Sequence, residues 1–519
     1  MNRKIWKALG IAVCMLALAA PRVMAETHSH MVSNDGILKQ AIKAINNSSD
    51  DNANEIILTS GFTLEGDPTE YTLRRGTTTI KGEGNTITVN PGAGITVTGE
   101  KTVLNLGANG YDKKLTIDGN AKGAFITVSG GATAYMYENV TLQNRQQVDQ
   151  ACVVLEENSV FNMHGGVIEK CSRAVIAGSG ATFHMFDGEI KDCRAGGNRV
   201  ISVNGGSKFI MDGGTISGCK VGAGGGLFVD SSTIRISGGI ISECTTSDTG
   251  NGGGLYAKNS TIKITGGRIE NNKAALGGGV ALIGKTTFED SITNWTVIGN
   301  EAYATGGVGG GIKLENGSMD VSAGSNRIYN NTADGQGADI FLLNDSSTIK
   351  LPNAANMGAK YHDSGINIDG WYKDDNPRYT PSESGVPVNV DGAEPLKGAL
   401  SLVASYKASP VRIEIDANGG KGGSGSQTVQ KGTTVTLEAP TKEGHLFTGW
   451  KDEKGNSYPA GEDGKVNITA TGDMTLTAEW KKLPSAENLP KTGDESPVLL
   501  WGVALAVSAA ACFMLRRRK

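Results

Sequence analysis

Apolar positions repeat with a fixed pattern through the middle of the chain, where five segments align residue for residue. The segments are residues 161–171, 183–193, 209–219, 234–244 and 262–272. Each has two apolar residues separated by one position, then a turn with glycine, then an isoleucine, and three residues later a cysteine or asparagine. The last positions of successive segments lie 22, 26, 25 and 28 residues apart. Alternation broken by glycine indicates short strands, and a period of this length indicates a repeat architecture.

The repeat also predicts how these strands are arranged. In a parallel β-helix each coil lies about 4.8 Å above the previous one, so equivalent residues stack into ladders. The expected inward ladder holds Phe161, Phe183 and Phe209, with a methionine two residues after each. Helical repeats would need apolar residues at i, i+3 and i+4, and these segments lack that spacing. We therefore expect an all-β chain whose main part, residues 26–405, is a parallel β-helix (solenoid).

A cysteine or asparagine ends each repeat and forms a second, structural ladder. Its members are Cys171, Cys193, Cys219, Cys244, Asn272 and Asn300, continued by Asn331. Buried asparagines at a coil corner can hydrogen-bond the backbone of neighbouring coils, which explains them without a ligand. Stacked cysteines suit a disulfide in Cα separation but not in the direction of their parallel Cβ vectors, so free thiols are favoured and disulfides remain an alternative. Asn120 and Asn144 are expected to begin the ladder.

Other elements are expected on both sides of the aligned repeats. An amphipathic helix over residues 35–46 is predicted by the spacing of Ile37, Leu38, Ala41, Ile42 and Ile45. Because it directly precedes the first coil, it is expected to cap the exposed strand edges there. Irregular early strands are expected at residues 56–58, 79–80, 86–89, 95–97, 115–117 and 125–128. Later coils open with three glycines at residues 224–226, 252–254, 277–279 and 309–311, and residues 370–379 are expected to form a closing cap or loop.

The N-terminus has the organisation of a secretory signal peptide. Within residues 1–25, a basic start is followed by an apolar stretch and a small residue at the end. The stretch is too short to span a membrane comfortably, which disfavours a retained anchor. Signal peptidase is therefore expected to cleave between Ala25 and Glu26. His28 and His30 follow, and we interpret them as part of a flexible new N-terminus rather than a metal site.

Two sequence features resemble known β-helix families. The phrases T-T-I-K-G-E-G-N-T-I-T-V (residues 78–89) and K-L-T-I-D-G-N (residues 114–120) resemble pectate-lyase-like proteins. The combined units of I-x-x-N and three glycines, over residues 153–343, resemble the repeats of bacterial adhesin-like surface proteins. These resemblances imply a right-handed parallel β-helix and a role in surface contact.

A change of composition marks a second module at residues 411–482. The motifs F-T-G-W (residues 447–450) and M-T-L-T-A-E-W (residues 474–480) make it similar to the small β-grasp repeat of the internalin B-repeat kind. That resemblance implies a spacer or weak interaction module. Trp450 and Trp480 are expected to be core residues of this module rather than ligand contacts.

The last segment, residues 483–519, resembles the sorting signal of a Gram-positive surface protein. A linker leads to the pentapeptide Leu489, Pro490, Lys491, Thr492 and Gly493. A mainly apolar run at residues 497–515, of about membrane-spanning length, and a basic cluster follow. The resemblance implies recognition by sortase, cleavage between Thr492 and Gly493, and transfer to a peptidoglycan precursor. The chain would then be the substrate of this reaction and would contact the membrane only before sorting.

Composition and charge leave little support for other chemistry. The 519-residue chain has 74 glycines and a formal net charge of −4, so it lacks the basic footprint of a nucleic-acid-binding protein. Enzymes on this fold need facing carboxylates or an acidic calcium site beside a basic residue. The nearest carboxylate group, interpreted as a solvated face, consists of Glu156, Glu157, Asp187 and Glu189. His164 and His184 fall in different columns and are not expected to pair. We predict no catalytic residue, metal site or cofactor.

The sequence thus predicts a secreted protein anchored to the Gram-positive cell wall after passing through the cytoplasmic membrane as a precursor. Its expected role is adhesion to a host or matrix protein or to a glycan, which follows from resemblance and topology rather than from a recognised site. A carbohydrate-active β-helix enzyme and a passive structural stalk remain alternatives.

Overall fold

The structure is a computed structural model, and it divides into two compact units, Met1–Lys407 and Ala408–Lys519. The described residues are 27–49, 52–119, 123–145, 151–196, 199–323, 326–351, 366–373, 386–387, 396–397, 400–408, 410–430, 434–461, 463–470 and 472–483. Outside them lie residues 1–25 with the cleavage position Ala25/Glu26, the pentapeptide at 489–493 and the apolar run at 497–515. Among the described residues, no helix has the length and apolar character needed to cross a membrane.

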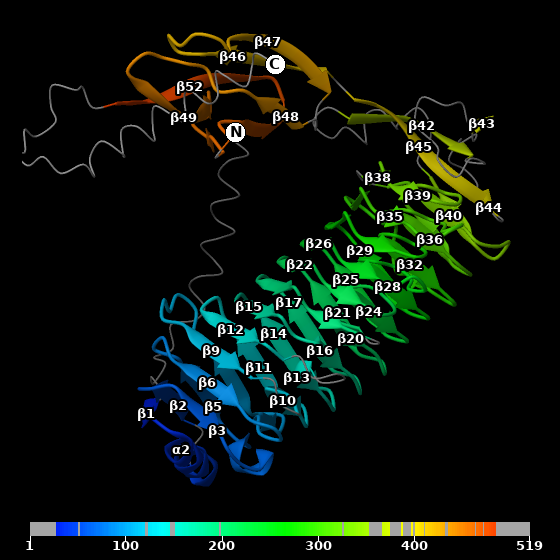
Figure 1. The fold of residues 1–519 in the computed structure, drawn as a ribbon. Coiled ribbons are helices and arrows are strands. Elements are labelled where there is room, and N and C mark those ends of the chain that lie inside the picture. Colours follow the sequence, from blue (N-terminus) through cyan, green and yellow to red (C-terminus); the bar gives the residue numbers. More distant parts are fainter. Residues whose placement is uncertain are drawn as a thin grey trace, which may run out of the picture. The chain divides into compact units, whose positions relative to one another are not determined.

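The first unit is a parallel β-solenoid, as predicted, and most of its coils contribute one strand to each of three long sheets (Figure 1). Sheet A contains β1 (Thr27–Val32), β2 (Ala53–Leu58), β5 (Thr77–Lys81), β8 (Val103–Leu106), β11 (Thr133–Met136), β14 (Val160–Met163), β17 (Thr182–Met185), β21 (Lys208–Met211), β25 (Thr233–Ile236), β29 (Thr261–Ile264) and β33 (Thr287–Phe288). Sheet B contains β3 (Phe62–Leu64), β6 (Thr86–Val89), β9 (Leu115–Asp118), β12 (Val140–Gln143), β15 (Val167–Glu169), β18 (Glu189–Lys191), β22 (Thr215–Ser217), β26 (Ile240–Ser242), β30 (Arg268–Glu270), β34 (Thr296–Ile298) and β38 (Arg327–Tyr329).

Sheet C lies on the third side of the coil and is extended by strands from after the last repeat. It contains β4 (Thr72–Leu73), β7 (Ile95–Thr98), β10 (Ile126–Ser129), β13 (Ala151–Leu155), β16 (Arg173–Ala177), β20 (Ile201–Val203), β24 (Leu227–Asp230), β28 (Leu255–Lys258), β32 (Val280–Ile283), β36 (Ile312–Leu314), β40 (Ile340–Leu342), β45 (Leu400–Ala408), β42 (Ile366–Lys373) and β43 (Val386–Pro387). Sheet D, between B and C, contains β19 (Arg194–Ala195), β23 (Lys220–Val221), β27 (Thr245–Thr246), β31 (Lys273–Ala274), β35 (Glu301–Ala302) and β39 (Thr332–Ala333). A three-stranded sheet contains β37 (Ser318–Asp320), β41 (Thr348–Lys350) and β44 (Leu396–Lys397).

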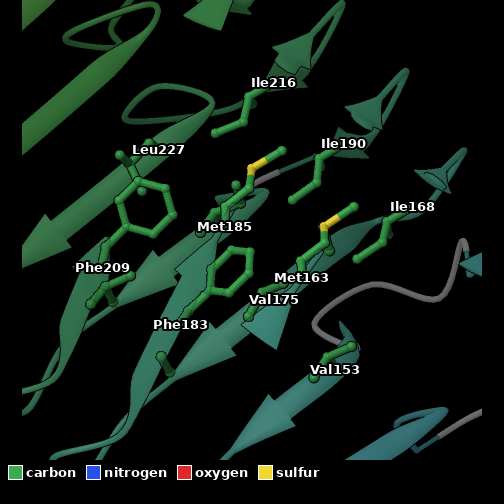
Figure 2. Packing of buried hydrophobic residues seen from close by; sticks show 14 of the residues in the cluster. Val153, Met163, Ile168, Val175, Phe183, Met185, Ile190, Phe209, Ile216 and Leu227 are labelled. Atoms are coloured by element: carbon green, nitrogen blue, oxygen red, sulfur yellow. The ribbon is translucent and has the colours of Figure 1, made fainter. Parts of the chain in front are cut away.

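The predicted inward ladder is the core of the solenoid. In sheet A, Phe161 pairs in register with Phe183, and Phe183 with Phe209. The ring centroids are 5.5 and 5.4 Å apart, and all three side chains are fully buried. Figure 2 shows Phe183 and Phe209 side by side, with Met163 and Met185 forming the next row in the same interior. Identical side chains one coil apart therefore fill the interior and fix the register of the stack.

Glycine is required where sheet A turns into sheet B. At Gly214 the backbone has φ +78°, a left-handed conformation that glycine adopts without strain. A Cβ atom there would lie 2.6 Å from Cε of Met185 and 2.8 Å from the carbonyl oxygen of Gly188. The glycine column of the repeat thus lets the methionine row pack directly beneath the turn.

Both ends of the described solenoid carry elements that differ from a standard coil. The helix α2 (Asp35–Asn47) follows β1, is capped by Asn34, and contacts β1, β2, β3, β4 and the 3-10 helix η1 (Pro68–Tyr71). Its buried residues are Leu38, Ala41, Ile42 and Ile45. At the other end β45 pairs antiparallel with β40, and β44 pairs antiparallel with β41. Of the segment 370–379, residues 370–373 belong to β42 and the rest lies outside the described residues.

One N-terminal expectation was wrong. Residues His28 and His30 belong to β1, which pairs in parallel with β2 over its full length. This pairing orders the segment that we had interpreted as flexible, and Val32 at the end of the strand is buried.

The second unit is a small β module with its own core. Its main sheet has the order β47-β46-β52-β49-β50, in which only the central pair β46/β52 is parallel, and β48 pairs with β51 beside it. The strands are β46 (Pro410–Asp416), β47 (Gly425–Gln430), β48 (Thr434–Leu437), β49 (His445–Asp452), β50 (Ser457–Pro459), β51 (Val466–Thr469) and β52 (Met474–Lys482). Trp450 is fully buried in this core, and Trp480 packs against it and donates a hydrogen bond from Nε1 to the carbonyl oxygen of Ala417 at 3.1 Å.

Candidate functional site

The cysteine and asparagine ladder lies inside the solenoid at the corner that follows sheet B. The backbone N–H of each following residue donates to the carbonyl oxygen of the ladder residue one coil earlier. These bonds run from Arg194 to Cys171 at 2.7 Å and from Lys220 to Cys193 at 2.8 Å. The structure therefore stacks consecutive ladder residues directly above one another.

The asparagine half of the ladder is a continuous hydrogen-bond network. The amide oxygen of Asn272 accepts the backbone N–H of Cys244, and the amide oxygen of Asn300 accepts that of Asn272, both at 3.0 Å. Asn331 continues the chain and itself donates to Asp339 Oδ1 at 2.8 Å. Asn272 and Asn300 are fully buried. Their partners are all protein groups, so this network acts as structural support.

The cysteine half consists of free thiols. Cys171, Cys193, Cys219 and Cys244 are buried and form no disulfide, and the same holds for Cys152, which lies outside the ladder in β13. Burial raises the pKa of the Cys171 thiol, which donates to the carbonyl oxygen of Glu169 at 3.1 Å. Cys171 borders an open hollow of about 650 Å³ lined also by Lys170, Ser172, Asp192 and Arg194. A protonated thiol is a weak nucleophile, so the raised pKa of Cys171 does not favour nucleophilic chemistry by this residue.

One of the two asparagines predicted to begin the ladder, Asn144, lies one residue before the ladder position. Asn120 lies outside the described residues, and Asn144 has φ +65° and occupies the left-handed corner position before the ladder. The ladder position belongs to Arg145, whose carbonyl oxygen accepts the N–H of Ser172. Arg145 is fully buried, with its guanidinium carbon 5.4 Å from the ring centre of Phe125. Asparagine is favoured in left-handed corners, which explains why its presence was misleading there.

The outward side of sheet A carries a cluster of rings that the sequence analysis did not single out. The aromatic strip consists of Tyr135, Tyr137, His164, His184 and Phe186. These residues come from three consecutive coils, at β11, β14 and β17, and occupy two neighbouring outward columns. Phe186 is 36% exposed and the other four are half-buried. Writing the outward columns one under another would have revealed the cluster.

The rings of the aromatic strip stack on one another along the solenoid. Phe186 lies between the two imidazoles, with its ring centroid 4.4 Å from that of His164 and 3.6 Å from that of His184. His164 in turn stacks on Tyr137 at 5.6 Å and on Tyr135 at 5.8 Å. The two histidines occupy different columns, as predicted, but the exposed phenylalanine between them joins them into one stack.

A carboxylate lies at the end of the aromatic strip. Asp212 Oδ2 is 2.7 Å from Nε2 of His184, and its Oδ1 accepts a hydrogen bond from the hydroxyl of Ser237. The bond from Ser237 lowers the pKa of Asp212, burial acts in the opposite direction, and the bond to His184 lowers it further. Because the carboxylate separates the hydroxyl from the imidazole, this trio does not have the order in which a histidine activates a serine nucleophile.

The predicted carboxylate group is divided between two corners of the coil. Glu156 and Glu157 lie between β13 and β14, where sheet C turns into sheet A, whereas Asp187 and Glu189 lie where sheet A turns into sheet B. Glu189 pairs with Lys191. Within the described part of the chain, no cluster of three or more histidine, cysteine or acidic side chains could hold a metal ion.

Comparison with known proteins yields one match, in the second unit. Residues 413–479, from β46 to β52, match the model of the Listeria-Bacteroides repeat domain. No curated protein and no solved structure matches the chain. A parallel β-solenoid joined to a Listeria-Bacteroides repeat domain fits a repeat-rich surface or structural protein.

Proposed function

We propose that this chain is a secreted surface protein, attached covalently to the Gram-positive cell wall by sortase, whose solenoid contacts a host or matrix component. The observation that carries the proposal is the ending of the sequence, in which the pentapeptide at 489–493, the apolar run at 497–515 and a basic cluster follow one another. The solenoid and the repeat domain support it, because both suit a protein that presents a long surface.

The ending has a coherent physical logic. An apolar run of this length stops in the bilayer, and the basic residues hold its end on the cytoplasmic side. The pentapeptide then lies just outside the membrane. In the proposed reaction the sortase thiolate attacks the carbonyl carbon of Thr492 and breaks its amide bond to Gly493. An amine of the peptidoglycan precursor then takes over the acyl group and frees the enzyme.

The ends of the solenoid support a role outside the cell. Exposed strand edges promote aggregation through edge-to-edge pairing. We infer that α2 caps the first coils, because its apolar face is buried and it contacts strands of all three sheets. The antiparallel strands β44 and β45 pair with the last parallel strands β41 and β40 at the other end. A solenoid with covered ends is suited to display at high local density.

Attachment is tested by replacing one residue of the pentapeptide. In cells with sortase, the Thr492→Ala protein should be released by boiling in detergent, whereas the wild-type protein should be released only by enzymes that cut peptidoglycan. Ser485→Ala, in the linker that precedes the pentapeptide, is the matched control and should behave as the wild type. Covalent wall attachment of Thr492→Ala would overturn the sorting assignment.

Surface contact is tested separately with the purified chain from Glu26 to Lys482, applied to glycan arrays and immobilised matrix proteins. Saturable binding to either class would support the proposal. Failure in both screens would favour a passive stalk, and release of reducing ends from a polysaccharide panel would favour the enzyme alternative.

A further inference from the structure

We propose that the aromatic strip binds a neutral, extended, β-linked polysaccharide chain that lies along the solenoid axis. This inference rests on the proposed surface-contact function and names the class of ligand and the place where it binds.

The strip is held in position by the backbone beneath it. The N–H of His164 donates to the carbonyl oxygen of Met136 at 2.8 Å, and the N–H of Phe186 donates to that of Met163 at 2.9 Å. The parallel pairing therefore continues one residue beyond the strands and fixes the rings at the rise of the coils. Since the stack is preorganised, little side-chain entropy remains to be lost on binding.

The chemistry presented to solvent is that of a hydroxyl-binding surface. Because the rings face one another, they direct their edges and polar atoms outward. Aromatic edges carry partial positive charge, and the hydroxyls of Tyr135 and Tyr137 add hydrogen-bond donors and acceptors. Asn162 lies in register between Tyr135 and His184 in the same outward column. The ring of Phe186, 36% exposed, adds an apolar edge to this surface.

The charges around the strip favour a neutral ligand. The exposed carboxylates of Glu138 and Asp187 flank it, and at one end Asp212 lies near the exposed cation of Arg235. Burial lowers the pKa of His164, and the neighbouring His184 lowers it further, so His164 is uncharged at neutral pH. Fixed negative charge repels sulfated or uronic-acid polymers, whereas the carboxylates accept hydrogen bonds from the hydroxyls of a neutral glycan.

The straightness of the strip selects the conformation of the chain. Coils rise by about 4.8 Å each along a straight line. A sugar unit in an extended β-linked chain advances by a similar distance, so successive units meet successive coils. An α-linked chain that winds into a helix leaves this line after one or two units.

Calorimetry with the purified chain from Glu26 to Lys482 tests the inference. The probes are β-1,4-linked gluco-, manno- and xylo-oligosaccharides, with malto-oligosaccharides and polygalacturonate fragments as the α-linked and acidic comparisons. We expect the Phe186→Ala variant to bind the preferred β-linked probe about tenfold or more weakly, as for an interface hot spot. Tyr137→Phe, which removes one hydroxyl, should weaken binding by a smaller factor. Thr265→Ala, exposed in the same column beyond the strip, should bind as the wild type.

The outcomes separate this inference from the proposed function. Hydrogen exchange of the Phe186→Ala protein checks that the coils of β14, β17 and β21 remain folded. Unchanged glycan affinity of a folded Phe186→Ala protein would overturn the ligand site but leave surface contact intact. If the wild-type protein binds matrix proteins but none of the oligosaccharide probes, the ligand site is likewise overturned and surface contact stays intact. If the rings only stabilise the coils, the variant loses protection from exchange while the wild-type protein binds no glycan.

Discussion

Removal of one buried amide side chain, that of Asn300, is expected to destabilise the neighbouring coils of the solenoid strongly. Its side-chain oxygen accepts hydrogen bonds from both N and Nδ2 of Asn272 at 3.0 Å. Its Nδ2 lies 2.9 Å from the carbonyl oxygen of Ile269, 3.1 Å from that of Ile298, and 2.9 Å from Oδ1 of Asn331. The Asn300→Ala variant removes all of these partners at once in a fully buried place.

The expected magnitude follows from the groups left without partners. The replacement deprives two donors of Asn272 of their acceptor, and an unsatisfied buried polar group costs about 1–3 kcal/mol. The Nδ2 group of Asn272 keeps its bond to Ile241, so the backbone N–H is the more strongly affected donor. We expect the coils around β31 and β35 to lose about 2–6 kcal/mol of opening free energy, from two groups at that unit cost.

Hydrogen exchange detects this loss locally, which matters because solenoids need not unfold in one step. At about 1.4 kcal/mol per factor of ten, amides of β30, β31, β34 and β35 should exchange about 30- to 10⁴-fold faster in Asn300→Ala. Amides of the early coils at β7 and β10 serve as an internal reference and should be unchanged.

Two further variants serve as a control and as a case with an intermediate loss of exchange protection. Glu301→Ala removes only an exposed ion pair with Lys273, so protection should change by less than about 1 kcal/mol. Asn300→Cys should be intermediate, because Cys244 in the same ladder donates to the carbonyl oxygen two residues earlier but its sulfur is a weak acceptor. Equal protection in Asn300→Ala and Glu301→Ala would refute the reasoning, because the amide network would then contribute nothing measurable.

Three other predictions concern a turn, the thiols and the helix α2. Gly214→Ala should lower the urea midpoint more than Gly206→Ala, because both glycines have a left-handed backbone but only Gly214 has atoms close to the new Cβ; equal shifts would refute this. The five buried cysteines of the described chain should react with a thiol reagent only after denaturation, and reduction should leave the mass unchanged. Burial raises the pKa of Asp35, but hydrogen bonds from Lys39 and Tyr71 outweigh it and the net pKa lies below the ordinary 3.8. Its stabilising contribution is therefore present above pH 3.8 and is lost as pH falls through the lower folded-state value. The amides of α2 should lose protection in acid, and they should lose less in Asp35→Asn.

The fold was predictable where the repeat is regular. Apolar residues that recur at matching positions, such as Phe161, Phe183 and Phe209, have one simple explanation, which is direct stacking. The early coils were harder, because their inward positions vary from Thr78 to Leu104 and Ala134 in one column. Strands β8, β11 and β12 were therefore missed, although they follow the same rise.

The candidate site was less accessible to sequence reasoning. Outward residues vary freely, so a cluster such as Tyr137, His164 and Phe186 becomes visible only after the register is known. The position of Asn144, one residue before the ladder member Arg145, has a similar origin. Asparagine serves two different roles at adjacent positions of the coil, a left-handed corner and a buried ladder member, and the sequence alone does not separate them.

The two signatures of the later repeats, a buried asparagine and a run of three glycines, contact each other in the structure. The third glycine of each run packs against the side chain of the next ladder residue along the chain. A Cβ at Gly254 would lie 3.0 Å from Nδ2 of Asn272, and one at Gly279 would lie 2.8 Å from Cγ of Asn300. The earlier Gly226 meets the sulfur of Cys244 in the same way at 2.8 Å. The ladder residue can therefore change from cysteine to asparagine while the glycine stays, because the glycine provides room for either side chain and the backbone hydrogen bonds set the spacing. This explains why the ladder stays in register across the change of residue type.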